Sequence, residues 1–389
     1  MNYLIFIPSL YITVSILYQF ILGIASLFDF RKINSLNGRH AFKKILIVVP
    51  AYREDSVILN SCRENFKVNY PNHLYDILVI ADQMKKETNL ALREMGVIVF
   101  KVSFKNSTKA KALNAVNEFV KSSDYEGQII LDADNIMSKN FLKRSSKLLC
   151  AGYEAVQALR QAKKLNSPAS VFDALAEIAN HKMLCQGANV IGLSSKLSGS
   201  GMLLSKVKFL EIIPKLSAIG GFDKEMELLM TKMKIKIYYD GNIHVKDEKC
   251  QDFNQMSRQR ARWLESQYSF FRKNFVYACK ALNEGNFDYF HKVIQLALPP
   301  RTLIPIASLI LGLISLICGL DTLAIINLTA FLLNLFTYII LTPFNWILKH
   351  GANLILALPK LIHSTIKSLS LMPQSKKEFI HTQHFQNDV

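Results

Sequence analysis

Residues 128–134 read QIILDAD, and three similar apolar runs precede them: KILIVVP at 44–50, DILVIAD at 76–82 and VIVFKV at 97–102. Polar stretches of helical character separate the runs, including one near Ala110 to Lys121. Strands that alternate with helices predict an α/β domain with a mostly parallel, Rossmann-like sheet. In such sheets ligands bind beyond the carboxyl ends of the strands, so the residues after each run are the candidates for a site.

The composition fits one catalytic domain with membrane segments. The chain has 389 residues, 50% of them hydrophobic, and 47 Lys and Arg against 30 Asp and Glu give a formal charge of +17. In a membrane protein a basic surplus follows the positive-inside rule and contacts anionic lipids, so nucleic acid is not an expected partner. The six cysteines form no CxxC pair, which indicates neither zinc nor a disulfide framework.

The first apolar segment is long enough to cross a bilayer. Residues 3–28 carry no charge, and a basic cluster follows them. A cleaved signal peptide is the alternative, but the segment lacks a basic start and is longer than an h-region. We therefore expect an uncleaved anchor over residues 1–30 with its N-terminus outside, and a catalytic domain over residues 31–263 on the cytoplasmic face of the cell (inner) membrane.

Two further uncharged runs lie near the other end, at residues 303–320 and 322–347. They predict a transmembrane hairpin over residues 301–348, and Arg301 and Lys349 at its outer ends place both flanks inside. Soluble buried helices are the alternative, but these stretches have no polar face.

Two amphipathic segments are expected at the membrane surface. Residues 264–300 mix aromatic and basic side chains, which suits a helix in the headgroup region. Residues 349–389 are expected to hold an interfacial helix and a tail, because Pro359, Lys360 and Lys367 interrupt the apolar stretch from 352 to 372. A third C-terminal span over that stretch is the open alternative.

Asp132 and Asp134 end the QIILDAD run, one residue apart. If the strand opens into a turn there, both carboxylates can reach one site. Carboxylate oxygens of this kind suit Mg²⁺ or Mn²⁺, which keep open positions for phosphate oxygens. An Asp-x-Asp pair alone is more often a solvated turn or a helix cap, but its place after a buried strand favours the metal site.

In this context the chain resembles the GT-A fold of family 2 glycosyltransferases, and most closely their membrane-embedded branch of cellulose, chitin and hyaluronan synthases. The resemblance runs from about Lys44 to Trp263 and continues through the C-terminal spans. It implies that Tyr52 and Glu54 in PAYRED flank the uracil and ribose of the donor, and that Asp82 faces the base.

The same resemblance assigns the diphosphate side of the donor. Lys109 in TKAKALN matches a lysine near the donor phosphates, although a surface lysine at a helix start is the ordinary alternative. The DAD pair Asp132 and Asp134 corresponds to the metal and diphosphate motif of the family.

GGFDKEMELLM at residues 220–230 occupies the position of the family's TED motif, whose acidic residue is the general base. Alignment on Glu227 and Leu228 places Glu225 at the base position, where the family has Asp. Asp223 stays open as the base, since a positioned carboxylate of either kind can take the acceptor proton. A helix cap is the alternative reading of the acidic cluster.

QRARW at residues 259–263 matches the Q-x-x-R-W motif of the membrane-integrated enzymes. The resemblance implies that Gln259 and Arg262 hold the leaving diphosphate and that Trp263 stacks on the acceptor sugar. Thr382 and His384 have the spacing of the gating loop of cellulose synthases, which would bring them to the diphosphate. A loose tail is the alternative.

Together these motifs predict an inverting transferase that moves a sugar from a UDP-sugar to a hydroxyl of a growing glycan. Processive polysaccharide synthesis is the favoured form, with single addition to a lipid-linked or membrane acceptor as the alternative. The alternative outside the enzymes is a non-catalytic scaffold that binds a nucleotide. Because three spans are few for glycan export, a homo-oligomer or an export subunit is an expected partner beside membrane lipids.

Overall fold

The computed structural model describes residues 2–28 and 42–374. The half of the chain that is expected to be catalytic is built on one mixed eight-stranded sheet with the strand order β3-β2-β1-β4-β7-β6-β8-β5. The strands are β1 (Ile45–Tyr52), β2 (Tyr75–Asp82), β3 (Ile98–Val102), β4 (Gly127–Ile130), β5 (Ile136–Met137), β6 (Ala155–Ala162), β7 (Met202–Ser205) and β8 (Tyr238–Asp247).

The four apolar runs form the parallel half of this sheet. Strand β1 pairs in parallel with β2 and β4, and β2 pairs in parallel with β3. The other half is mixed, because β7 runs antiparallel to both β4 and β6 while β8 is parallel to β6. The predicted α/β class is confirmed, with more antiparallel pairing than the sequence indicated.

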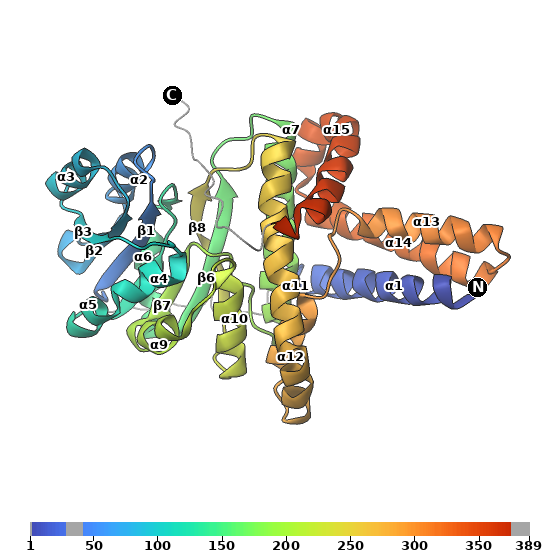
Figure 1. Ribbon diagram of the computed structural model, residues 1–389, viewed down its shortest axis with the longest axis horizontal. Helices are drawn as coiled ribbons and strands as arrows, with labels where there is room; N and C mark the ends of the chain where they lie inside the picture. The colour runs from blue at the N-terminus through green and yellow to red at the C-terminus, as the bar shows by residue number, and fades with distance from the viewer. Residues whose placement is uncertain (1, 29–41, 375–389) are drawn as a thin grey trace.

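Helices cover both faces of the sheet (Figure 1). Successive side chains of β1 point to opposite faces, so Ile47 belongs to one buried cluster and Val48 to the other. The first cluster includes residues of α2 (Ile58–Asn65), α3 (Lys86–Glu94) and α6 (Phe141–Cys150). The second includes residues of α4 (Lys109–Ala115), α5 (Asn117–Ser122), α9 (Lys206–Ile212) and α10 (Phe222–Lys232).

A helical segment joins the catalytic half to the N-terminal helix. It consists of α7 (Pro168–Asn180), a π-helical stretch (His181–Gly187) and α8 (Ala188–Val190). Gly187 lies so close to α1 (Asn2–Ala25) that an added Cβ would sit 2.1 Å from the carbonyl oxygen of Leu22. Only glycine permits this backbone contact.

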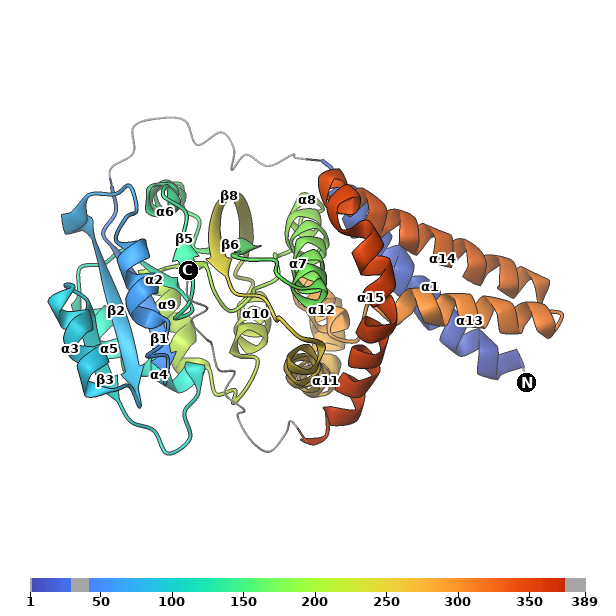
Figure 2. The same cartoon turned by 90° about the horizontal axis from the view of Figure 1, so that it is seen from above.

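Helices α1, α13 (Ile304–Ile317) and α14 (Asp321–Leu341) lie side by side and extend away from the sheet (Figures 1 and 2). The turn between α13 and α14 makes the expected hairpin. Helix α14 ends at Leu341 instead of continuing to 347, because Pro343 has no N–H to extend a helix. Helix α13 has 14 residues, which at 1.5 Å each span about 21 Å.

Long helices separate the bundle from the sheet. Helix α15 (Phe344–Leu371) runs across the bundle in both views and packs against α11 (Phe253–Asn283), which α12 (Phe287–Gln295) follows (Figures 1 and 2). Helix α11 is continuous through residue 263, so the expected boundary between the catalytic and interfacial segments falls inside one helix.

Three of the described helices are long and apolar enough to cross a membrane: Tyr3–Ala25, Asp321–Leu341 and Phe344–Leu371. The first two were expected. The third was expected to lie on the surface, because Pro359 and two lysines interrupt it; Pro359 is accommodated inside the helix, whose length and composition suffice for a span.

Candidate functional site

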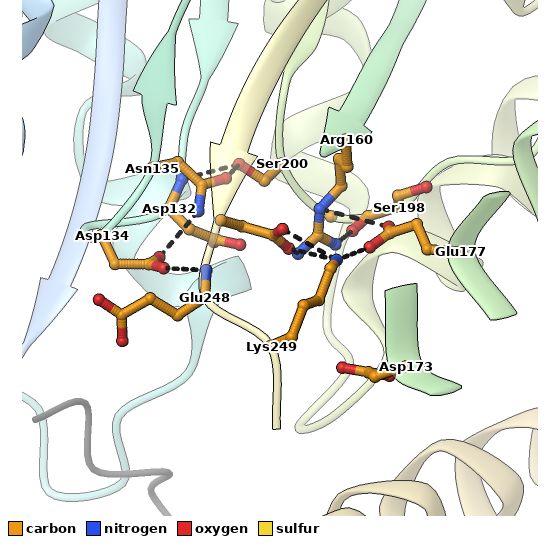
Figure 3. Close-up of polar contacts among 12 residues, drawn as sticks. Asp132, Asp134, Asn135, Arg160, Asp173, Glu177, Ser198, Ser200, Glu248 and Lys249 are labelled. Atoms are coloured by element: carbon orange, nitrogen blue, oxygen red, sulfur yellow. Dashed lines mark hydrogen bonds and ion pairs between the residues drawn. The ribbon is translucent and has the colours of Figure 1, made fainter. Parts of the chain in front are cut away.

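Asp132 and Asp134 lie in a tight turn directly after β4. The amide of Asn135 donates to the carbonyl of Asp132 at 3.0 Å, which closes the turn. Asp134 is buried, and its Oδ1 and Oδ2 accept hydrogen bonds from the Asn135 side chain at 2.8 Å and from the Glu248 amide at 3.2 Å (Figure 3). The turn therefore places the Asp134 carboxylate beside the segment that follows β8.

Lys109 reaches this turn from the N-terminus of α4. The Thr108 hydroxyl caps that helix by accepting from the amide of Lys111. The Lys109 ammonium forms an ion pair with Asp132, donates to the carbonyl of Gly199 at 2.7 Å and lies 4.7 Å from the ring centroid of Phe222. The structure thus brings the predicted phosphate-side lysine and the DAD pair together.

Tyr52 and Asp82 are paired neighbours at the ends of β1 and β2. The residues that follow them, Arg53 and Gln83, both have positive φ angles and are joined by a 2.9 Å hydrogen bond between their side chains. Asp82 is only 3% exposed, and its Oδ1 has no hydrogen-bond partner among the described residues. A buried carboxylate oxygen without a partner is costly, which suggests a ligand donor at this position.

A cavity of about 320 Å³ lies between the half of the chain that holds the sheet and helices α1 and α15. Asp223 at the start of α10 lines it, as do Gln259 and Trp263, which are one turn apart on α11. Gln19 of α1 and Thr365 of α15 also line it. The cavity thus joins three predicted site residues to the helices that leave the domain.

Glu225 lies elsewhere. Its carboxylate accepts hydrogen bonds from the Ser217 amide at 2.9 Å, the Ser217 hydroxyl at 3.0 Å and the Ala218 amide at 2.8 Å, and it is not among the residues that line the cavity. Residues two apart on a helix point about 200° away from each other, so Asp223 and Glu225 cannot face the same site. Only Asp223 of the two lines the cavity, and which of them is the base stays a prediction.

Arg262 of the QRARW motif lies outside the lining of this cavity, whereas Arg260 of the same motif lines it. Burial lowers the pKa of Arg262, and Cys250 partly opposes the shift. Contact between Arg262 and the diphosphate stays a prediction, and so do the roles of Thr382 and His384, which lie outside the described residues.

The sequence did not reveal a buried charge network that forms one wall of the cavity. Arg160 of β6 and Lys249 each form ion pairs with Glu177 of α7 and Asp247 of β8 (Figure 3). Burial acts to raise the pKa of Glu177, but Arg160 and Lys249 hold it well below its ordinary value. The sequence signal for this network is the presence of charged residues within otherwise apolar segments. Only the fold shows that these residues contact one another.

The donor atoms at the DAD turn suit a divalent cation. Among residues 2–28 and 42–374, no three His, Cys, Asp or Glu side chains are arranged to hold a metal by themselves. Asp132 and Asp134 offer hard carboxylate oxygens, and Mg²⁺ typically takes its other ligands from substrate phosphates and water. The residues therefore fit a cation that binds together with a diphosphate.

Residues 43–266 match the family described as "Glycosyltransferase like family 2", which is more than half of the chain. The chain belongs to this family. It is a glycosyltransferase, and its fold is of the GT-A type. Among solved structures, this family 2 protein is similar to the mannosyltransferase PcManGT from Pyrobaculum calidifontis in complex with GDP-Man and Mn²⁺. The two sequences are 15% identical, the match covers 94% of this chain and 100% of that chain, and the TM-score is 0.52.

Two other similarities were found. Over 223 residues the glycosyltransferase is 26% identical to the dolichyl N-acetyl-alpha-D-glucosaminyl phosphate 3-beta-D-2,3-diacetamido-2,3-dideoxy-beta-D-glucuronosyltransferase of Methanococcus voltae. The match covers 51% of this chain and spans 65% of the length of that relative. Glucosyl-3-phosphoglycerate synthase from Mycobacterium tuberculosis is 15% identical, with 59% and 79% of the two chains covered and a TM-score of 0.40.

Proposed function

We propose that this glycosyltransferase moves a sugar from a UDP-sugar to a hydroxyl of an acceptor held at the membrane, with inversion at the anomeric carbon. One observation carries the proposal: Asp223 lines a cavity whose walls come from both the catalytic half and helices α1 and α15. A proton acceptor is thereby positioned where a membrane-held acceptor can enter.

The nucleoside is assigned to the ends of β1 and β2. The unpartnered Oδ1 of Asp82 can accept a hydrogen bond from an N–H of the base. Tyr52 lies beside it in the sheet register, and Glu54 follows in the same loop. This arrangement supports the roles of Tyr52 and Glu54 at the base and ribose.

The diphosphate is assigned to the DAD turn. Asp132 and Asp134 would hold Mg²⁺ or Mn²⁺, which when bound neutralises charge on the leaving diphosphate. Lys109 is flexible and already within reach of Asp132, so it can contact a phosphate oxygen as a point charge. Gln259, which lines the cavity, would donate to the same group from the other side.

Transfer is a direct displacement. Asp223 accepts the proton of the acceptor hydroxyl while that oxygen bonds to the anomeric carbon, and the nucleoside diphosphate leaves from the opposite face. The anomer is therefore inverted. Trp263 is 47% exposed and lines the same cavity, so its ring can stack on the acceptor sugar.

Single addition to a lipid-linked acceptor is the better-supported form of the reaction. The name of the Methanococcus voltae relative describes a dolichyl-phosphate-linked acceptor. Processive glycan synthesis, with an oligomer or an export subunit, is the second candidate, because the QRARW motif at residues 259–263 resembles that of polymer-forming enzymes.

For topology we propose that α1 and the α13–α14 hairpin cross the membrane with the catalytic half on the cytoplasmic side of the cell membrane. Helix α15 runs across the bundle and packs along α11 (Figure 2). A helix across the bundle lies along the membrane surface when the bundle crosses it, which supports interfacial roles for α11 and α15.

The test is a donor panel. Detergent-solubilised protein is incubated with UDP- and GDP-sugars, Mn²⁺ or Mg²⁺, and either a lipid-linked sugar or an oligosaccharide, and the products are sized by mass spectrometry. One added sugar on the lipid supports single addition, and a ladder supports the processive form. Binding of no nucleotide sugar would contradict the proposed function.

A further inference from the structure

The cavity beside Asp223 has a membrane side as well as a catalytic side. Leu296 and Leu298, in the segment that leads from α12 to α13, line it together with Gln19 of α1 and Thr365 of α15. Gln267 of α11 holds that segment by donating to the carbonyls of Leu296 and Leu298 at 3.0 Å each. An occupant can therefore contact Asp223 and still extend along apolar residues toward the bundle.

Most of the acids in this cavity already have cationic partners. Arg160 and Lys249 neutralise Glu177 and Asp247 within the buried network. Glu227 forms an ion pair with Lys292 at 3.3 Å and accepts from the Leu197 amide at 2.7 Å. These acids consequently contribute little free negative charge toward the other cations of the cavity.

Three cationic side chains that line the cavity have fewer hydrogen-bond or ion-pair partners than these acids. Arg301 donates through Nη2 to the Asn180 side chain at 2.7 Å and to the carbonyl of Ala176 at 3.3 Å, but its buried Nη1 has no hydrogen-bond partner among the described residues. Within residues 2–28 and 42–374, the Arg260 guanidinium hydrogen-bonds only to the Thr365 hydroxyl, at 3.5 Å. The ammonium of Lys196 makes no hydrogen bond or ion pair within the part of the chain that the structure describes.

These cations lie close enough to repel one another. Burial lowers the pKa of Arg260, Asp173 opposes the shift, and the charge of Arg301 adds to it. Burial also lowers the pKa of Lys196, and the charges of Lys224 and Arg301 lower it further, while Asp223 and Glu227 oppose the shift. An anion bound among them would remove this repulsion and supply the missing hydrogen-bond acceptors.

We propose that Arg260 and Arg301 bind the phosphate or diphosphate of a lipid-linked acceptor, whose lipid chain extends toward α1 and α15. This proposal rests on the proposed function and specifies the acceptor class. Guanidinium groups match phosphate oxygens bidentately, and the apolar exit toward the bundle suits a lipid better than a soluble anion. The donor diphosphate is assigned separately to the DAD turn, so the cavity needs a second anion to satisfy these arginines.

The experiment measures the binding of a radiolabelled polyprenyl phosphate to the full chain in phosphatidylcholine nanodiscs, with uncharged polyprenol as the comparison. We expect the phosphate to bind at least about tenfold more tightly than the polyprenol, since each charge-assisted contact adds affinity. Arg260→Gln and Arg301→Gln should each weaken the binding of polyprenyl phosphate by roughly tenfold. Neither variant should change the binding of polyprenol. Arg272→Gln, an exposed position on the same helix α11, makes the same charge change and should have no effect.

Four outcomes would overturn the proposal. The first is that polyprenol binds as tightly as polyprenyl phosphate, and the second is that both variants bind polyprenyl phosphate as tightly as the wild type. The third is that inorganic phosphate, at the same concentration as the lipid, displaces it completely. The fourth is that the variants lose affinity for the nucleotide sugar and not for the lipid. Arg301 also anchors Asn180, so Arg260→Gln keeps the test decisive if Arg301→Gln does not fold. Wild-type protein that binds polyprenyl phosphate but no nucleotide sugar would contradict the transferase function and leave this site standing.

Discussion

Asp223 and Glu225 lie two residues apart on α10, yet Asp223 lines the cavity while Glu225 accepts three hydrogen bonds from Ser217 and Ala218. The helix rotates by about 100° per residue, so one carboxylate faces the cavity and the other holds a neighbouring loop. The two acids of this motif therefore have different surroundings.

We therefore expect Asp223→Asn to lower kcat by about 10² to 10⁴, the usual contribution of a general base, while donor binding is retained. Glu225→Gln should turn over near the wild-type rate, because an amide can still accept hydrogen bonds at Ser217. Initial rates with a saturating UDP-sugar would check both. Loss of turnover in Glu225→Gln together with normal turnover in Asp223→Asn would restore the assignment suggested by the sequence.

A second prediction concerns the DAD turn. EDTA should abolish transfer and added Mn²⁺ or Mg²⁺ should restore it, because Asp132 and Asp134 would otherwise face a diphosphate without a cation between them. Asp134→Asn should reduce kcat by roughly 10² or more. Asp124→Asn is the matched control, since Asp124 is exposed and forms an ion pair with Lys44 at 2.8 Å, away from the DAD turn. Full activity of the EDTA-treated wild type would exclude this assignment.

The sequence predicted the parallel strands β1 to β4 and the residues at their ends, because β-branched runs and strand-end acids are local signals. It could not choose between Asp223 and Glu225, since that choice depends on how α10 is rotated against its neighbours. It also missed the contact of Arg160 with Glu177, whose residues come from a strand and a helix that only the fold brings together.

The Arg160 network gives a third prediction, on stability. Glu177→Gln leaves Arg160 and Lys249 short of a buried partner, so we expect the free energy of unfolding to fall by about 3–5 kcal/mol. Glu118→Gln, which removes an exposed 3.7 Å pair with Lys121, should change it by less than about 1 kcal/mol. Denaturant unfolding in detergent would measure both variants, and equal stabilities would show that the network is not stabilising.

The stability difference between wild type and Glu177→Gln should change with pH in one direction. Arg160 and Lys249 hold the pKa of Glu177 below its ordinary value, against the effect of burial. A depressed pKa in the folded state stabilises the protein above the unfolded pKa of about 4.3, and this contribution is lost as the pH falls. The stability difference between wild type and Glu177→Gln should therefore be full near pH 7 and shrink in acid. A difference that grows on acidification would contradict the ion-pair account.

The last prediction concerns topology and uses a native cysteine. Cys318 is exposed in the turn between α13 and α14, at the same end of the bundle as the start of α1 and far from the sheet (Figures 1 and 2). If α1 and the hairpin cross the membrane, a membrane-impermeant maleimide should label Cys318 in intact cells, and Cys318→Ser should remove that label. A cysteine introduced at Lys143, exposed on α6, should react only after permeabilisation. Labelling of position 143 in intact cells would place the catalytic half on the wrong side of the membrane for a cytosolic nucleotide sugar. Protection of Cys318 in both intact and permeabilised cells would show that the hairpin does not cross the membrane.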